Sequence, residues 1–208
     1  SYIFVHIPKT GGTSLALALE DRAMKDDIML GDTPKALKRR KKVKGIATSG
    51  RLWKHSALSD IDGLLSPDEI AQMFTFTLVR NPWDRLVSYY HWLREQGFDH
   101  PAVRLAKAQT FEGFLSDATI QASQRHWPAA SYMTDLRGVE RCSRYIRLEH
   151  FAQDAAPLIA HLGFEVILPW ENRSERVADW REYYSTQMRA IVADCCAEDI
   201  ARFGYRFR

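Results

Sequence analysis

The sequence predicts an α/β fold, a single domain over residues 1–208 with a central, mostly parallel sheet flanked by helices. Two strand–loop–helix units lead to this prediction, one beginning at Tyr2 and the other at Phe74. Each passes from a run of apolar, β-favouring residues through a short loop to a segment with apolar residues at helical spacing. Strands that alternate with helices in this way are typical of a parallel sheet.

Length and composition agree with one compact domain. The chain has 208 residues, of which 46% are hydrophobic and 12% aromatic. This is enough for one well-buried core and short for two. The formal net charge is +3, which suits a protein with an anionic ligand and does not require nucleic acid as a partner.

The first unit begins with an expected strand at residues 2–7, which stops at Pro8. A helix is expected next, with Thr13 or Ser14 as its N-cap. Its apolar positions are Leu15, Leu17 and Leu19.

The second unit is preceded by a short helix with a capping box, formed by Ser66 and Glu69. The strand is expected at residues 74–79, where residues alternate, and it ends at Arg80. Asn81 then opens a second helix together with the proline that follows it.

The rest of the chain supplies four further expected elements. A core strand is predicted at residues 145–148 and a weaker one near residues 43–48. Amphipathic helices are predicted over residues 152–162 and 185–203, each followed directly by a glycine that can end it.

Cysteine usage and hydropathy bear on the compartment. Cys142, Cys195 and Cys196 are odd in number, and the last two are adjacent within an expected helix, so a disulfide framework is not expected. No apolar run approaches the roughly 18 residues of a membrane span, and the amino end resembles a strand more than a secretion signal. We expect a cytoplasmic protein without a transmembrane segment in this chain.

The loop between the first strand and its helix is expected to bind phosphate. Its backbone N–H groups, the helix dipole and the Lys9 ammonium can converge on an anion. The candidate binding residues are Lys9, Thr10, Gly11, Gly12, Thr13 and Ser14. A Walker A loop places its lysine after the last glycine, whereas Lys9 comes before both glycines, which argues against an ATPase or GTPase. The alternative is a tight turn with an exposed lysine.

This loop resembles the 5′-phosphosulfate loop of sulfotransferases that use 3′-phosphoadenosine-5′-phosphosulfate (PAPS), particularly their carbohydrate-directed branch. The segment from Arg80 to Tyr90 is similar to that family's 3′-phosphate motif, in which an arginine at a strand end and a serine eight residues later bind the 3′-phosphate. Arg80 and Ser88 match in spacing and order. The alternative makes Arg80 an ion-pair partner of Asp84 and leaves Ser88 without a role in binding.

The resemblance implies a P-loop-like nucleotide-binding sulfotransferase fold, PAPS as co-substrate, adenosine 3′,5′-bisphosphate as product and no metal. A looser resemblance to bacterial members covers residues 172–174 and 180–207. It suggests that Arg173 and Ser174 close over the nucleotide, although a surface loop would explain them equally well.

The implied reaction is in-line transfer of the sulfuryl group to an acceptor hydroxyl, with Lys9 stabilising charge on the bridging oxygen. The acceptor must lose a proton, and His55 is the expected general base. Weaker candidates are Glu20, Asp60 and Glu149. His6 is expected to be a packed histidine.

The acceptor expected from the family is a hydroxyl of a carbohydrate or glycolipid. The basic stretch at residues 38–44 is suited to an acidic acceptor or an anionic lipid surface, or is simply solvated. The oligomeric state is open. Two other functions remain as alternatives, namely a P-loop-like kinase or nucleotide hydrolase, which predicts Mg²⁺ dependence, and a noncatalytic nucleotide-binding module.

Overall fold

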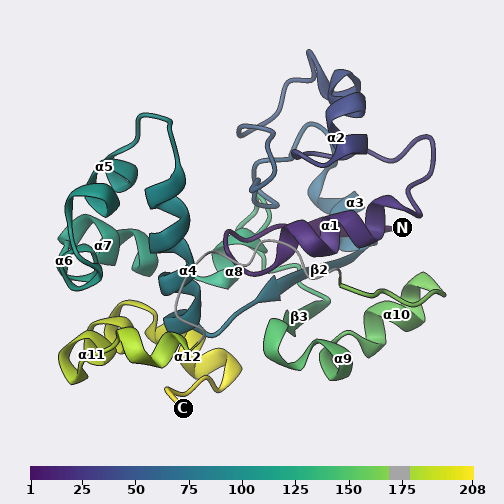
Figure 1. Cartoon of the computed structure of the whole chain (residues 1–208). Coiled ribbons are helices and arrows are strands. Elements are labelled where there is room, and N and C mark those ends of the chain that lie inside the picture. The colour runs from purple at the N-terminus through teal and green to yellow at the C-terminus, as the bar shows by residue number, and fades with distance from the viewer. Residues whose placement is uncertain (169–178) are drawn as a thin grey trace. The chain divides into compact units, whose positions relative to one another are not determined.

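A computed structural model describes residues 1–168 and 179–208. Its described residues form a parallel sheet in the order β1 (Tyr2–Val5), β2 (Phe74–Val79) and β3 (Arg144–Arg147) (Figure 1). The predicted α/β class with a parallel sheet flanked by helices is therefore confirmed. The chain divides into two compact units, Ser1–Val79 with Ala129–Glu171, and Arg80–Pro128 with Asn172–Arg208. That residues 1–208 act as one domain stays a prediction.

One hydrophobic cluster of the first unit lies on one face of the sheet. Phe76 and Leu78 of β2 are fully buried and face the same way, because side chains alternate along a strand. They pack against α1 (Gly12–Glu20) and α10 (Ala156–Leu162), and α1 runs along the sheet in Figure 1. Burying each large side chain contributes roughly 1.5–3 kcal/mol. The other members of this cluster include Leu15, Leu19, Ile146 and Leu158.

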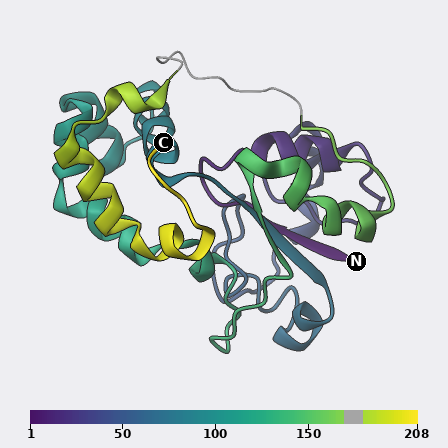
Figure 2. The ribbon, with the colours of Figure 1, turned by 90° about the horizontal axis from the view of Figure 1, so that it is seen from below.

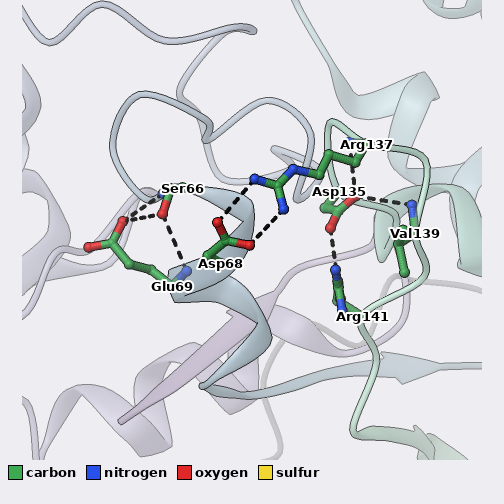
Figure 3. A network of polar contacts seen from close by, with 7 residues as sticks. All are labelled: Ser66, Asp68, Glu69, Asp135, Arg137, Val139 and Arg141. Carbon is green, nitrogen blue, oxygen red and sulfur yellow. Dashed lines mark hydrogen bonds and ion pairs between the residues drawn. The ribbon is translucent and has the colours of Figure 1, made fainter.

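The short helix before β2 starts as the sequence predicts. In α3 (Pro67–Ala71), the Ser66 hydroxyl accepts from the Glu69 N–H, and the Glu69 carboxylate accepts from the Ser66 N–H at 2.8 Å, so the capping box is complete (Figure 3). Asp68 in the same turn receives two hydrogen bonds from the Arg137 guanidinium, at 2.6 and 3.1 Å. The helix is thereby tied to the segment that leads into β3.

That segment is organised around the buried carboxylate of Asp135. It accepts from the backbone N–H groups of Arg137 and Val139 and from Arg141 Nε at 2.8 Å (Figure 3). Because three donors face the ionised form, the pKa of Asp135 is lowered although burial opposes the change. The segment follows α8 (Ala129–Tyr132).

Three predicted elements of this unit are wrong in detail. Residues 43–48 form no strand, since the chain there follows α2 (Pro34–Arg39) and a 3₁₀ turn, η1 (Arg40–Val43), into a turn at Gly45 with φ +84°. The strand predicted at 145–148 starts one residue earlier, and Leu148 begins a 3₁₀ turn, η2 (Leu148–His150). The helix predicted at 152–162 is two helices, α9 (Phe151–Asp154) and α10.

The break between α9 and α10 has a local cause. Pro157 lies in the first turn of α10 and has no N–H to donate to the preceding turn, so a helix can restart there but not run through. The glycine expected to end the helix does so, because Gly163 adopts the left-handed conformation with φ +74°.

The second unit is helical. Asn81 caps α4 by accepting from the Trp83 N–H at 3.1 Å, as predicted. Helix α11 contacts α6 and α7, and the yellow carboxyl-terminal helices lie beside the teal ones in Figure 2. The helix predicted over 185–203 is again two helices, because Cys196 leaves the helical conformation between α11 and α12. The elements are α4 (Pro82–Glu95), α5 (Pro101–Ala108), α6 (Phe111–Ser116), α7 (Ala118–His126), η3 (Trp180–Tyr183), α11 (Thr186–Cys195) and α12 (Ala197–Phe203).

The expectations about disulfides and about membrane-spanning helices can be compared with the described residues. Cys142, Cys195 and Cys196 are all free thiols. Among the described helices, none is long and apolar enough to cross a membrane.

The end of β3 depends on a buried ion pair. The Asp154 carboxylate, 6% exposed, accepts from Arg147 Nε at 2.7 Å, from Arg147 Nη2 at 3.0 Å and from the Arg147 backbone N–H at 3.1 Å. These bonds, the guanidinium foremost, lower the pKa of Asp154. We predict that Asp154→Asn reduces the free energy of unfolding at pH 7 by about 2–3 kcal/mol, measured by urea denaturation.

The loss of stability caused by Asp154→Asn should be full near neutral pH and should shrink in acid. Because the folded-state pKa of Asp154 is lowered, its contribution is present above the unfolded value of about 3.9 and is lost as the pH falls through the folded value. The wild type should therefore lose its advantage over Asp154→Asn in strong acid. Asp99→Asn, which removes the partner of Arg104 in an exposed pair, should change stability little. Equal losses in the two variants would contradict the assignment.

Candidate functional site

The loop after β1 turns sharply through two residues with positive φ. Gly11 has φ +88°, which glycine adopts without strain, and Lys9 has φ +64°, which is uncommon for a residue with a side chain. Thr10 lies between them with its side chain turned inward, and its hydroxyl donates to the Ile7 carbonyl at 2.8 Å. The strained position of Lys9 is of the kind found at ligand-binding loops.

Helix α1 begins earlier than the sequence suggests. Its N-cap is Gly11, without a side-chain cap, so the expected capping by Thr13 or Ser14 is wrong. The reason is the left-handed turn at Gly11, which sets the helix direction before either hydroxyl is reached. Gly12, Thr13 and Ser14 thus form the first helical turn, whose N–H groups have no acceptor within a helix and point outward at its positive end.

The second glycine of the loop is required by close packing. A Cβ at position 12 would lie 2.1 Å from Cδ2 and 2.5 Å from Nε2 of the His6 ring. These distances are far below a real contact, so the histidine ring occupies the space that any other residue would need. This contact could not be predicted from the sequence, because it depends on how the loop between His6 and Gly12 folds back and not on a recognisable spacing.

His55 lies beside the same loop. Its Nδ1 donates to the His6 carbonyl at 2.7 Å. Its ring packs edge-on against the His6 ring, with centroids 4.6 Å apart, and against Trp53, at 4.9 Å. Since a carbonyl only accepts, this bond assigns the proton of neutral His55 to Nδ1 and leaves Nε2 with its lone pair.

His6 differs from His55 in what it can do. Burial is the main cause that lowers the pKa of His6 to about 3, and the nearby charges of His55, Lys54 and Lys9 act in the same direction. His6 is therefore neutral at physiological pH. This agrees with the expectation that His6 is a packed residue. Its ring packs on the ring of His55, the candidate base.

Two of the other base candidates are engaged elsewhere. Glu20 is buried at the far end of α1, about 12 Å along the axis from the loop, where its carboxylate accepts from the Lys35 N–H. Asp60 accepts from the Ala57 N–H at 2.8 Å within its own turn. Glu149 is exposed in η2. Of the four candidates, His55 is the one whose described contacts include a residue bordering the loop, namely His6.

The segment predicted to bind the 3′-phosphate begins at Arg80 and lies in the second unit. Arg80 follows β2 directly, and its Nε and Nη2 donate to Asp84 Oδ2 at 2.8 and 2.7 Å. Both side chains are largely buried, at 13% and 15% exposed. This is the ion pair considered as the alternative role of Arg80, and it also holds the guanidinium in a fixed orientation. Ser88 is buried in α4.

Two predicted binding residues and the expectation of no metal remain to be compared with the structure. Arg173 and Ser174 lie outside the described residues. Within residues 1–168 and 179–208, no group of three or more histidine, cysteine, aspartate or glutamate side chains is arranged to hold a metal ion.

Comparisons with known proteins point to one family. A model described as "Sulfotransferase family" matches residues 1–206. The crystal structure of mouse sulfotransferase SULT7A1 complexed with PAP is similar, with a TM-score of 0.51 and 16% identity, over 96% of this chain and 84% of that one. The structure of a sulfotransferase from Alicyclobacillus acidocaldarius aligns over 99% of this chain and 96% of that one, at 16% identity and a TM-score of 0.39. No curated protein sequence matches.

At such identities the mouse structure bears on the fold alone, and the TM-score of the bacterial one is too low to support an inference. The mouse likeness is consistent with the parallel sheet and its flanking helices. The family assignment itself rests on the match of the family model along nearly the whole chain.

The packing of His6 on Gly12 yields a prediction. Gly12→Ala should force the ring away and lower the free energy of unfolding by about 1–3 kcal/mol, measured by denaturant titration. In the background of His6→Ala, the space is open and the same change should cost much less. Additive effects of the two changes would contradict the contact. Gly97→Ala, where an added Cβ meets nothing within 4 Å, serves as the control.

Proposed function

The chain belongs to the sulfotransferase family, and we propose that it transfers a sulfuryl group from PAPS to a hydroxyl group of a carbohydrate or glycolipid. The observation that supports this most is the family match over residues 1–206, which includes both phosphate motifs. The loop between β1 and α1, with Lys9 and Gly11 at positive φ before a helix start, supports the anion-binding half of the proposal independently of the match.

The 5′ side of the nucleotide is assigned to the loop. The N–H groups of Gly12, Thr13 and Ser14 at the first turn of α1 suit a phosphate. Thr10 would contribute through its backbone, because its hydroxyl is bonded to Ile7. Lys9 is assigned to the bridging oxygen, where negative charge develops as its bond to sulfur breaks. A side chain at position 12 would clash with the His6 ring, so glycine keeps this turn in its present form.

The 3′-phosphate is assigned to Arg80 and Ser88. Arg80 follows Val79, the last residue of β2, and so begins where that strand ends at the carboxyl edge of the sheet. Ligands of open α/β sheets bind at that edge. Asp84 would act as a positioning residue, since it accepts two bonds from the guanidinium. Arg173 and Ser174 remain candidates for closing over the nucleotide.

His55 is assigned as the general base. In the reaction the acceptor oxygen forms a bond to sulfur, the bond from sulfur to the bridging oxygen breaks, and the hydroxyl proton leaves. With its Nδ1 proton held by the His6 carbonyl, His55 can take that proton at Nε2. A neutral His6 beside it adds no competing charge.

The proposal also covers the domain organisation, the metal requirement and the cellular compartment. We propose that residues 1–208 act as a single sulfotransferase domain, that no metal is needed, and that the protein works in the cytoplasm. The free thiols of Cys142, Cys195 and Cys196 support a reducing compartment.

Nucleotide selection can be tested by calorimetry without added metal. We predict that adenosine 3′,5′-bisphosphate binds more tightly than AMP, which lacks only the 3′-phosphate. Arg80→Ala should reduce this preference by roughly 10- to 100-fold, because a charge-assisted contact to the 3′-phosphate is lost. Affinity for AMP should change little, which separates a lost contact from a damaged fold.

Arg104→Ala provides the matched control, since Arg104 is an exposed arginine paired with an aspartate. If Arg80→Ala keeps the full preference, or if tight binding requires Mg²⁺ and favours ATP, the proposal fails and a kinase or nucleotide hydrolase becomes the better assignment.

The base can be tested by kinetics with sulfur-labelled PAPS and whichever glycan or glycolipid acceptor a screen identifies. His55→Ala should lower turnover by roughly 10²- to 10⁴-fold and leave the affinity for adenosine 3′,5′-bisphosphate nearly unchanged. His55→Asn keeps a donor near the position of Nδ1 but no base at Nε2, so it should be equally slow. An active His55→Asn variant would make His55 a positioning residue only. His126→Ala, at an exposed histidine, controls for loss of a histidine.

A further inference from the structure

Two surface segments of the first unit, residues 24–28 and 37–46, are held side by side. Arg39 Nη1 donates to the Met24 carbonyl at 2.7 Å and to the Asp27 carbonyl at 3.4 Å. Lys42 Nζ donates to the carbonyls of Lys25 and Asp27. These contacts join the loop after α1 to α2 and η1, around the label α2 in Figure 1. We call the surface formed by the two segments the basic–apolar face.

This face carries a concentrated positive charge. Its residues include seven lysines and arginines against two aspartates, a net charge of +5, in a chain whose total is +3. Arg39 and Lys42 are used to join the segments, whereas Lys38, Arg40, Lys41 and Lys44 are exposed. Within the described part of the chain, none of these four forms an ion pair. The positive charge therefore faces solvent.

The same face exposes large apolar side chains, which water does not favour. Met24 is 71% exposed, Ile28 46%, Leu37 42% and Ile46 37%. Both segments contribute apolar side chains, and in each segment basic residues lie between these along the chain. Exposed apolar side chains grouped in this way mark a site of interaction more often than an ordinary surface.

We propose that the basic–apolar face docks on the surface of an anionic lipid bilayer. Lysine and arginine side chains are attracted to acidic headgroups, and apolar side chains beside them enter the boundary between headgroups and acyl chains. Each basic residue near such a surface raises the partition coefficient by roughly fivefold. The protein would lie on the bilayer and not span it.

Other polyanions fit the face less well. An acidic glycan would pair with the cations but leave Met24 and Leu37 in water. A single-stranded nucleic acid is usually held by aromatic side chains on which bases stack, and the two segments contain no aromatic residue. The combination of charge with exposed aliphatic side chains is what favours lipid.

The inference does not rest on the proposed sulfotransferase activity, because none of these residues is assigned to the nucleotide or to the base. It can therefore be tested on the whole protein without an acceptor, and it can fail while the enzymatic proposal stands.

The experiment is sedimentation of the full chain with vesicles of phosphatidylcholine, with and without about one-third phosphatidylserine, at near-physiological salt. The wild type should sediment with the anionic vesicles and not with the neutral ones. Lys38→Gln combined with Lys41→Gln should weaken binding by roughly 25-fold, from two lost charges. Met24→Ser combined with Leu37→Ser should weaken it by roughly tenfold or more, from lost apolar burial.

Lys107→Gln combined with Arg208→Gln removes the same charge from exposed positions outside the face and should bind like the wild type. Retention on immobilised heparin identifies the competing ligand class. The proposal is overturned if the wild type does not bind anionic vesicles. It is also overturned if Met24→Ser with Leu37→Ser leaves vesicle binding unchanged while only the charge variant loses binding to both vesicles and heparin, which would indicate a polyanion site.

Discussion

The packing of the His6 ring on Gly12 is the contact on which the candidate site depends. It joins the end of β1 to the first turn of α1, so the loop between them has little freedom. It also places His6 against His55. The His55 ring packs on the His6 ring, and His55 Nδ1 donates to the His6 carbonyl. A single steric constraint thus positions the turn proposed to bind an anion together with the candidate base, and it explains why glycine suits position 12.

The parallel sheet supplies the frame for this contact. Tyr2 to Val5 pair in register with Phe74 to Thr77, so the loops after both strands start from one edge. The strands are held at that edge by the Thr77 hydroxyl, which donates to the Val5 carbonyl at 2.7 Å in the buried interior. Within the second unit, Asp84 holds the Arg80 guanidinium in a fixed orientation. Local bonds of this kind preorganise charged groups before any ligand arrives, which reduces the cost of ordering them upon binding.

The sequence predicted those parts of the fold that depend on neighbours in the chain. The capping box at Ser66, the cap at Asn81 and the glycine stop at Gly163 are local, and all are confirmed. The strand expected at 43–48 is wrong because apolar residues alone cannot show that no neighbouring strand is present to pair with them. The break at Cys196 was equally invisible, since apolar spacing continues across it.

In the candidate site, too, motifs contained in one short segment were predictable, whereas contacts that depend on how the chain folds were not. The loop could be proposed as a phosphate site because its glycines and lysine lie within one short segment, whereas the contact of His6 with Gly12 could not be predicted, because it depends on how a turn folds back. This contact also has an electrostatic consequence. Burial and the positive charges around it lower the pKa of His6 to about 3, so His6 carries no charge beside the candidate phosphate loop at physiological pH. A neutral His6 can therefore support the loop and orient His55 without exchanging a proton itself.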